Sequence, residues 1–204
     1  LMKDNATGET KDIMWLLQSA LGVSFKDMLP EARRLCGIAT VSPSIQKKEK
    51  PKAPRGNGRS TKGTPAHEYL TQDRQLCTEV IEKYKVGYSE FKTDSNEHAW
   101  TAPFIDTDGD LVYVKKTGLK KTEKGKKEIR SSTPHSTLWG WWNVDDNTRK
   151  IIITEGEIDA MSSAQISSKY PSLSLPSGCA DMKWIDHDWD QLSQFETIYL
   201  MMDM

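Results

Sequence analysis

The segment 150–203 alternates short apolar runs with stretches of helical character, and this pattern constrains the fold more than any other feature of the chain. The apolar runs are KIIIT at 150–154, SLSL at 172–175 and TIYLMMD at 197–203, separated by helical stretches at 158–169 and about 186–194. Short strands separated by helices predict a parallel sheet with helices flanking it. The expected fold class of this segment is therefore α/β.

Acidic residues follow two of these predicted strands. Glu155 comes directly after IIIT, Asp203 follows IYLMM, and Asp159 lies one helical turn after Glu155. Ligands bind at the carboxyl ends of parallel strands, so we expect the three carboxylates to lie along one edge of the sheet. Clustered carboxylates repel one another unless cations neutralise them, and Mg²⁺ is a hard cation that takes oxygen ligands. We predict a magnesium site at this edge.

The same acidic residues allow a plainer interpretation. Glu157 and Asp159 fall in the first turn of the predicted helix, where the helix dipole favours negative charge. Glu155 precedes that helix, and its position at the strand end favours a functional role.

Three further segments are predicted upstream of residue 150. Residues 10–37 show apolar residues at helical spacing, with Ser24 as an N-cap, so we expect a helical hairpin within 1–40. Residues 41–65 contain four Pro, three Gly, and seven Lys or Arg against one Glu, which predicts a basic disordered linker. Residues 66–149 are expected to form a small domain that makes the chain α+β overall.

Two elements are predicted within 66–149. A helix is expected over 66–88. The run HAWTAPFIDTDGDLVYVKK alternates apolar and polar residues around Gly109, which predicts a β-hairpin. The three aspartates of DTDGD do not form a calcium-binding loop of the EF-hand kind, because that loop requires Gly at its sixth position and here Gly comes fourth.

Charge is distributed unevenly, although the formal net charge is only −1. Residues 111–130 contain eight Lys or Arg against two Glu, whereas 155–203 contain nine Asp or Glu against two Lys. A carboxylate-rich site with basic surroundings suits a polyanionic substrate handled through a divalent metal.

Composition limits other classes of function. Cys36, Cys77 and Cys179 form no C-x-x-C pair, so we expect buried free thiols and neither a zinc ribbon nor a disulfide framework. The sequence contains no apolar run of about 18 residues and no signal-peptide pattern, so we expect no membrane partner and a cytoplasmic location.

The aromatic and histidine side chains are not predicted to act in the site. The three tryptophans of LWGWWN are compatible with base stacking, but core packing is favoured. His187 lacks ligand spacing and is assigned no role.

The motif TEGEIDAMS, followed about 45 residues later by an apolar strand that ends in Asp, resembles the Toprim domain. That family pairs a Glu after one strand with Asp-x-Asp after a later one; Glu155 matches the Glu and Asp203 the first Asp. EGEID, SLPSG and FETIYLMMDM together are similar to phage primase-helicases and mitochondrial Twinkle. Because the chain stops at Met204, where the second Asp would come, we expect a longer parent polypeptide and a truncated Toprim domain at 150–204.

The resemblance extends upstream. FIDTDGDLVYVKK through HSTLWGWW resembles the amino-terminal part of a primase RNA polymerase domain, expected over 66–149. The resemblance implies that basic residues there contact template or nucleotide. Lys115 matches such a lysine best, and the further candidates are Lys116, Lys120, Lys121, Lys124, Lys126 and Lys127. TKDIMWLLQSALGVSFKDM resembles the segment after a primase zinc ribbon, so zinc is expected only in a missing amino-terminal domain, of which 1–40 is the tail.

The resemblance implies a DNA primase, a nucleotidyltransferase that joins ribonucleoside triphosphates into short RNA primers on single-stranded DNA with Mg²⁺. It further implies a primase-helicase with a carboxyl-terminal hexameric helicase domain. Asp203 and Asp159 would be metal ligands, and Glu155 either a further ligand or the catalytic base. Two alternatives stay open: a Toprim nuclease, and a non-catalytic module that binds single-stranded DNA.

Overall fold

The computed structural model describes residues 59–131, 136–179 and 181–203, with a few isolated positions before them. It divides the chain into two compact units, Leu1–Lys50 and Pro51–Met204. In the first unit, β1 (Met2–Lys3) pairs antiparallel with β2 (Thr10–Lys11). The predicted helical hairpin otherwise falls outside the described residues. The predicted boundary between 149 and 150 lies inside the second unit, and the division into domains stays a prediction.

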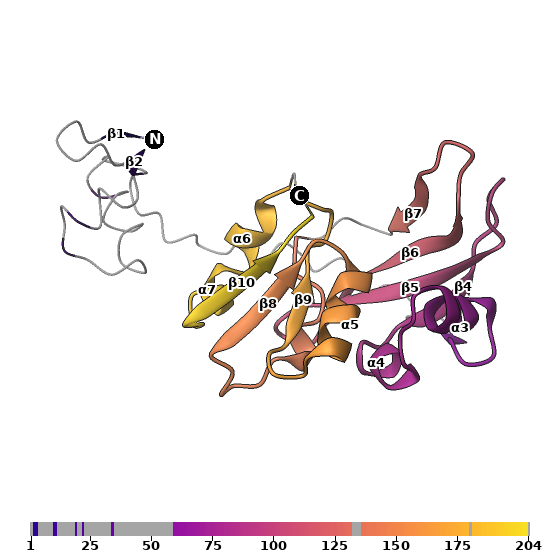
Figure 1. Cartoon of the computed structure of the whole chain (residues 1–204), viewed down its shortest axis with the longest axis horizontal. Coiled ribbons are helices and arrows are strands. Elements are labelled where there is room, and N and C mark those ends of the chain that lie inside the picture. Colours follow the sequence, from indigo (N-terminus) through magenta and orange to yellow (C-terminus); the bar gives the residue numbers. More distant parts are fainter. Residues whose placement is uncertain are drawn as a thin grey trace. The chain divides into compact units, whose positions relative to one another are not determined.

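The second unit begins with a five-stranded antiparallel sheet, ordered β3-β4-β5-β6-β7 (Figure 1). Its strands are β3 (Arg59–Ser60), β4 (Gly87–Glu90), β5 (His98–Ile105), β6 (Leu111–Lys121) and β7 (Lys127–Ser131). The predicted hairpin is confirmed as β5–β6. Gly109 adopts a φ of 84° at its turn, and Asp106 Oδ1 accepts hydrogen bonds from the backbone N–H groups of Asp108 and Asp110.

Short helices pack beside this sheet. They are α3 (Pro65–Glu68), the π-helical turn η1 (Tyr69–Asp73) and α4 (Thr78–Lys83). The prediction of one continuous helix over 66–88 is therefore wrong. The chain breaks after η1, where Gln75 adopts a positive φ of 57°, and this break lets both Leu70 and Leu76 reach the core.

The predicted linker is also wrong at its carboxyl end. Residues 59–60 form β3, and the Thr64 side chain caps α3 by accepting a hydrogen bond from the backbone N–H of His67, with Pro65 at the first helical position. The linker's earlier residues, 41–58, fall outside the described residues.

A three-stranded parallel sheet, ordered β10-β8-β9, forms the other part of this unit. Its strands are β8 (Lys150–Thr154), β9 (Ser172–Ser174) and β10 (Thr197–Met201), and its helices are α5 (Glu157–Ile166), α6 (Lys183–His187) and α7 (Trp189–Leu192). The predicted alternation of strands and helices is confirmed, except that two short helices replace the one expected over 186–194. The second unit is thus mixed α/β, and its described residues form one antiparallel and one parallel sheet.

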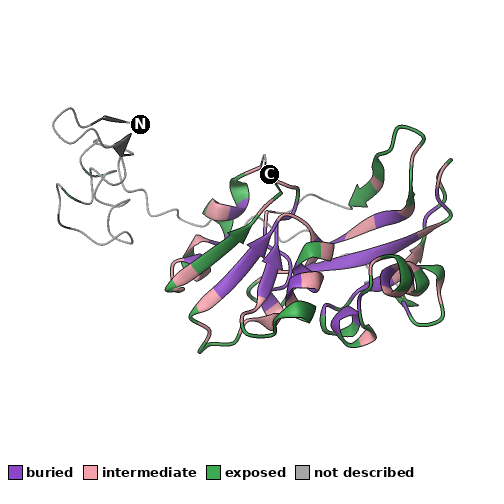
Figure 2. Cartoon of the chain, viewed as in Figure 1, coloured by how far each residue is buried: buried purple, intermediate pink, exposed green. Residues whose placement is uncertain are grey.

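The central strand β8 separates two hydrophobic cores. Ile151 and Ile153 pack into a core that includes Trp141 and Trp184, beneath α6 and α7. On the side of α5, Met161 joins a core shared with the antiparallel sheet, so α5 connects the two sheets. Figure 2 shows β8 and β9 buried and the edge strand β10 largely exposed.

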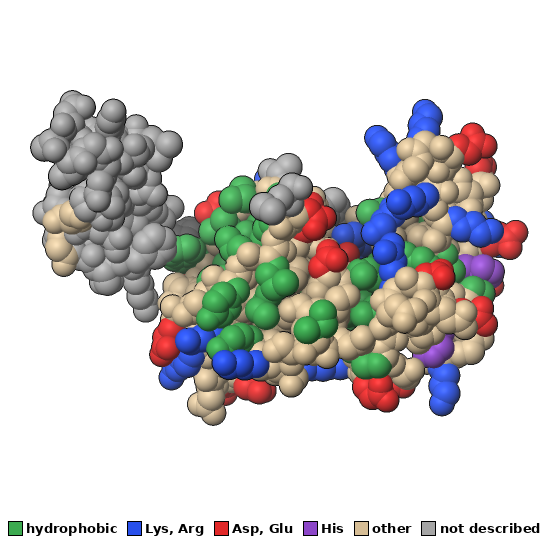
Figure 3. Space-filling model, in the orientation of Figure 1, with side chains coloured by type: hydrophobic (Ala, Val, Ile, Leu, Met, Phe, Trp, Pro, Cys, Tyr) green, Lys and Arg blue, Asp and Glu red, His purple; other side chains and the backbone are tan. Residues whose placement is uncertain are grey.

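The edge strand β10 exposes apolar side chains to solvent. Four consecutive side chains from Ile198 to Met201 are exposed, with Leu200 at 62%. Hydrophobic side chains gather over this strand in the space-filling view (Figure 3).

A buried carboxylate between α6 and α7 accepts hydrogen bonds from the segment before β8. Asp188 is 1% exposed, and its Oδ2 accepts hydrogen bonds from Leu138 N at 2.7 Å, Trp141 Nε1 at 3.0 Å and Thr137 Oγ1 at 3.3 Å. Its Oδ1 lies 2.6 Å from Nδ1 of His187, and this hydrogen bond raises the pKa of the imidazole. His187, to which the sequence assigned no role, is thus the charge partner of Asp188.

Two other expectations are settled by burial. Trp139 and Trp141 are core residues, as favoured from the sequence, and Trp142 is half-buried with its Nε1 donating to Lys83 O. The expectation of buried thiols is wrong for the described cysteines, because Cys77 and Cys179 are exposed. Within the described ranges, no helix has the length and apolar character required to span a bilayer.

Replacing Asp188 tests its role in the fold. Asp188→Ala leaves three donors without their acceptor inside the core, so we expect the free energy of unfolding to fall by about 3–5 kcal/mol. Urea unfolding measures this change. Asp190→Ala, at an exposed position in α7, is the matched control and should stay within about 0.5 kcal/mol of the parent. Equal losses in the two variants would contradict a special role for Asp188.

Candidate functional site

The carboxyl ends of β8 and β10 bring the predicted acidic residues to one edge of the parallel sheet. Thr154 of β8 pairs with Met201 of β10, so Glu155 and Asp203 emerge from neighbouring strands. Asp159 lies in the first turn of α5, which begins two residues after Glu155. The negative charge of Asp203 raises the pKa of Asp159, and the charges of Glu157 and Glu155 do so as well. The structure therefore brings Glu155, Asp159 and Asp203 to the same edge.

The three carboxylates nevertheless divide between two cavities. Asp159 and Asp203 line one of about 440 Å³, together with Thr154 and Ser162 (the Asp159–Asp203 cavity). Glu155 lines another of about 540 Å³ (the Glu155 cavity), whose charged lining is completed by Lys115, Asp181 and Lys183. The edge is thus one acidic region with two separate openings.

The electrostatics of the edge reflect this crowding. Burial raises the pKa of Asp159, and the nearby carboxylate of Asp203 raises it further, whereas the charge of Lys127 opposes the rise. Lys127, at the start of β7, is thus the hairpin lysine whose charge reaches the acidic edge. In Figure 3, acidic side chains lie in the middle of the face shown, with Lys and Arg side chains gathered beside them along the β6–β7 hairpin.

Lys115 is held inside this region. Its Nζ lies 2.7 Å from Oε1 of Glu157 and 3.3 Å from the carbonyl oxygen of Pro176. The neighbouring Lys116 points to the opposite face of β6, where its Nζ donates to Ser89 Oγ at 3.0 Å. Of these two neighbouring candidates, only Lys115, the one that the resemblance favoured, lies at the acidic edge.

The remaining candidate lysines form an exposed basic surface on the β6–β7 hairpin. This hairpin surface consists of Lys120, Lys121, Lys124, Lys126 and Lys127.

Sequence reasoning missed several residues of the Glu155 cavity. Tyr113, Asp181 and Lys183 line this cavity. Near it, the Glu155 carboxylate raises the pKa of the Cys179 thiol by hydrogen bonding and by its negative charge. The available signal was positional, because residues 176–181 follow β9, the third strand of the parallel sheet, and its carboxyl end opens on the same edge.

The donor set fits a magnesium ion that completes its coordination with substrate. Among the described residues, no three His, Cys, Asp or Glu side chains form a group that could hold a metal. Mg²⁺ is commonly bound by one or two carboxylates together with waters and substrate phosphates. Asp159 and Asp203, which share a cavity and repel one another, meet that smaller requirement.

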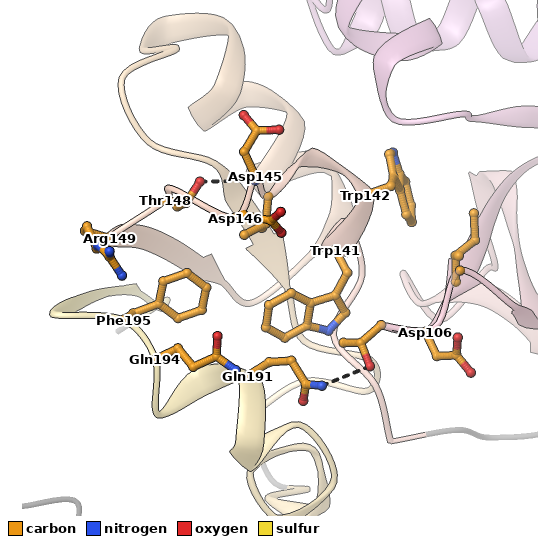
Figure 4. A pocket seen from close by; sticks show the side chains of 14 residues that line it. Asp106, Trp141, Trp142, Asp145, Asp146, Thr148, Arg149, Gln191, Gln194 and Phe195 are labelled. Atoms are coloured by element: carbon orange, nitrogen blue, oxygen red, sulfur yellow. Dashed lines mark hydrogen bonds between the residues drawn. The ribbon is translucent and has the colours of Figure 1, made fainter.

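A further cavity, of about 350 Å³, lies at the opposite ends of these strands. Trp141 occupies the middle of its lining, with Asp145 and Asp146 on one side and Gln191 and Gln194 on the other (Figure 4). Its charged lining comprises three aspartates, which are Asp106, Asp145 and Asp146, against the single cation Arg149. The Glu155 cavity has two lysines against two acids, so a polyanion meets less repulsion there.

Comparisons with known proteins relate the chain to primases, although no family model matches it. The DNA helicase/primase of Enterobacteria phage T3 is 32% identical over 123 residues, which cover 59% of this chain and 20% of that protein. The chain thus spans about a fifth of the length of this curated relative.

Solved structures show the same relationship. One match belongs to the bacteriophage T7 lagging-strand DNA polymerase interacting with primase domains of two gp4 subunits, bound to an RNA/DNA hybrid and dTTP. It has a TM-score of 0.54 and 26% identity, over 65% of this chain and 64% of that chain. The primase fragment of the bacteriophage T7 primase-helicase shares the fold, with a TM-score of 0.55 and 22% identity over 81% of this chain and 67% of that chain.

In sequence and in fold, the chain is similar to Toprim-type primases. The similarity in sequence is to the DNA helicase/primase of phage T3 and, among solved structures, to primase domains of phage T7. The resemblance found in the sequence is confirmed.

The raised pKa of Asp159 yields a test of the metal site. A carboxylate whose pKa is raised on folding lowers stability when it is ionised, and this penalty disappears as the pH falls through the folded pKa. We therefore expect Asp159→Asn to raise the melting temperature at pH 7 without divalent ions, and to do so less as the pH is lowered.

Magnesium should oppose this difference in melting temperature between Asp159→Asn and the parent protein. Millimolar Mg²⁺ is expected to stabilise the parent protein more than Asp159→Asn, because the ion binds the folded state and neutralises Asp159 and Asp203. Thermal unfolding with and without Mg²⁺ measures both effects, with Asp73→Asn, exposed in η1, as control. Equal stabilisation of all three proteins would exclude Asp159 as a ligand.

Proposed function

We propose that this chain is the primase part of a phage-type primase-helicase and that it joins ribonucleotides into short RNA on a single-stranded DNA template. The observation that carries the proposal is the acidic edge of the parallel sheet. There, carboxylates from two neighbouring strands lie beside lysines of an adjoining hairpin, in a chain similar to primase domains. This arrangement suits a reaction between polyanions in the presence of a divalent cation.

Asp159 and Asp203 are the proposed magnesium ligands. Mg²⁺ bound there would stabilise negative charge on the attacking and leaving oxygens of phosphoryl transfer. Thr154 and Ser162 add hydroxyl groups to the lining of the same cavity, in keeping with the oxygen-rich surroundings that this ion requires.

Glu155 is proposed as the base that accepts the proton of the attacking hydroxyl. Its place in a cavity apart from Asp159 and Asp203 favours this role over that of a third metal ligand. Lys115 and Lys183, in the same lining, supply positive charge for the phosphates of a ribonucleoside triphosphate.

The hairpin surface is proposed to bind the single-stranded DNA template. Its lysines are exposed on the β6–β7 hairpin, which is continuous through β6 with Lys115. Lysine contacts to phosphates give affinity without choice of sequence. Lys127 lies where this surface meets the acidic edge.

The rest of the protein enters the proposal through the phage T3 relative, of which this chain matches about a fifth. We propose that the whole protein carries a hexameric helicase domain after the primase part and a zinc-binding domain before it, and that it acts in the cytoplasm.

The reaction is tested with single-stranded DNA, Mg²⁺ and labelled ribonucleotides, by resolving the products on a gel. The parent protein should make short RNA, and Glu155→Gln should lower the rate at least about 100-fold because the amide accepts no proton. Glu79→Gln, exposed on α4, is the matched control and should retain activity.

The products also separate the competing functions. Shortened DNA in the absence of ribonucleotides would indicate a nuclease. DNA binding without any product, and without an effect of Glu155→Gln, would indicate a binding module and end the primase proposal.

Template binding by the hairpin surface is tested by charge reversal. Lys121→Glu together with Lys124→Glu should weaken binding of single-stranded DNA to a similar degree for every sequence. The salt dependence should also decrease, by about 0.7 in the log–log slope for each phosphate that the protein no longer neutralises. Fluorescence anisotropy across a salt series measures both quantities. The same double reversal at Lys62 and Lys83, exposed outside the hairpin, keeps the net charge equal; an equal weakening there would argue against a specific surface.

A further inference from the structure

The ion pair between Lys115 and Glu157 has features that a surface contact lacks. The two side chains are only 13% and 7% exposed, and their charged atoms are 2.7 Å apart. Lys115 belongs to β6 of the antiparallel sheet and Glu157 to the helix α5, and the two are 42 residues apart in the sequence. Burying two charges has a substantial desolvation cost, which close geometry and additional hydrogen bonds must offset.

Glu157 is well placed to hold a cation. It is the first residue of α5, where the helix dipole stabilises a carboxylate. α5 itself is fixed by packing between the two sheets, with Ala160 and Met161 fully buried. The Glu157 carboxylate is therefore attached to a helix that is held by buried packing contacts.

Lys115 is held with one donor unused. An ammonium group has three N–H donors, and the hydrogen bonds to Glu157 and Pro176 account for two. The third has no partner among the described residues. Because Lys115 lines the same cavity as Glu155, a ligand in that cavity can accept this hydrogen bond.

We propose that Glu157 is a positioning residue, which holds the Lys115 ammonium at the wall of the Glu155 cavity so that its third N–H binds a phosphate of the incoming nucleoside triphosphate. This inference rests on the proposed function. It gives Glu157 a role distinct from metal binding and from catalysis: Glu157 touches Lys115, and Lys115 touches substrate. A positioned cation contributes more than a mobile one because its orientation is already fixed before the reaction.

Amine labelling tests the positioning without any need for activity. Reductive methylation followed by peptide mass spectrometry gives the reaction rate of each lysine. We expect Lys115 to react more slowly than the exposed Lys62 in the parent protein, and to react faster in Glu157→Gln, with Lys62 unchanged. ATP, as the probe, should protect Lys115 and not Lys62.

Steady-state kinetics test whether the Lys115–Glu157 ion pair contributes to RNA synthesis. Normalised to the folded fraction, Glu157→Gln should lower kcat for RNA synthesis by about tenfold or more, because the ammonium is no longer fixed. KM for the nucleotide should stay level or fall, because a negative charge near the phosphates is removed. In a Lys115→Met background, Glu157→Gln should lower kcat no further, whereas independent action of Glu157 would give additive losses. Glu79→Gln is again the matched control.

The outcomes separate this inference from the proposed function. Equal labelling of Lys115 in the parent and in Glu157→Gln overturns the positioning role, whatever the activity. Additive kcat losses, or a KM that rises while kcat is retained, overturn it even where RNA is made. If the parent makes no RNA and ATP does not protect Lys115, the proposed function and the phosphate contact fail together.

Discussion

The central strand β8 is the constraint on which the rest of this structure depends. It is hydrogen-bonded on both edges, by β9 and β10, and its side chains are buried on both faces. A strand of this kind has little freedom to move, because any shift in register would expose isoleucines and disrupt two hydrogen-bonded ladders. The residues that follow it, Glu155 and the start of α5, therefore emerge at a fixed point.

The antiparallel sheet is tied to that fixed point by polar contacts as well as by packing. The Tyr84 hydroxyl donates to Ser172 O at 2.7 Å, which joins the end of α4 to β9, and Lys115 reaches Glu157 from β6. Such buried polar contacts add little net stability, but they are costly to break. Their effect is to specify how the two sheets meet, and the Glu155 cavity is lined from both.

Local patterns in the sequence were sufficient to predict the elements near the site. The strands of 150–203, the β5–β6 hairpin and the strand-end positions of Glu155 and Asp203 follow from periodicity and turn chemistry over a few residues. The break after η1 does not, because it depends on Leu70 and Leu76 finding the same core from either side of a turn. The partners of Lys115, and those of Asp188 apart from the adjacent His187, are likewise beyond a single sequence, since they lie more than 40 positions away. Local patterns therefore predicted which residues reach the edge, whereas tertiary contacts decide how their charges are paired.

That pairing leaves the charge of the edge unequally compensated. Glu157 is paired within the protein with Lys115, and Glu155 shares its cavity with Lys115 and Lys183. Asp159 and Asp203 repel one another in the neighbouring cavity, where the charge of Lys127 offsets only part of the effect, since the pKa of Asp159 remains raised. A divalent cation would therefore gain most in the Asp159–Asp203 cavity, and the phosphates of a nucleotide would gain most in the Glu155 cavity. Because the two cavities open on the same edge, this unequal compensation supports the proposed separation of a metal site from a nucleotide site.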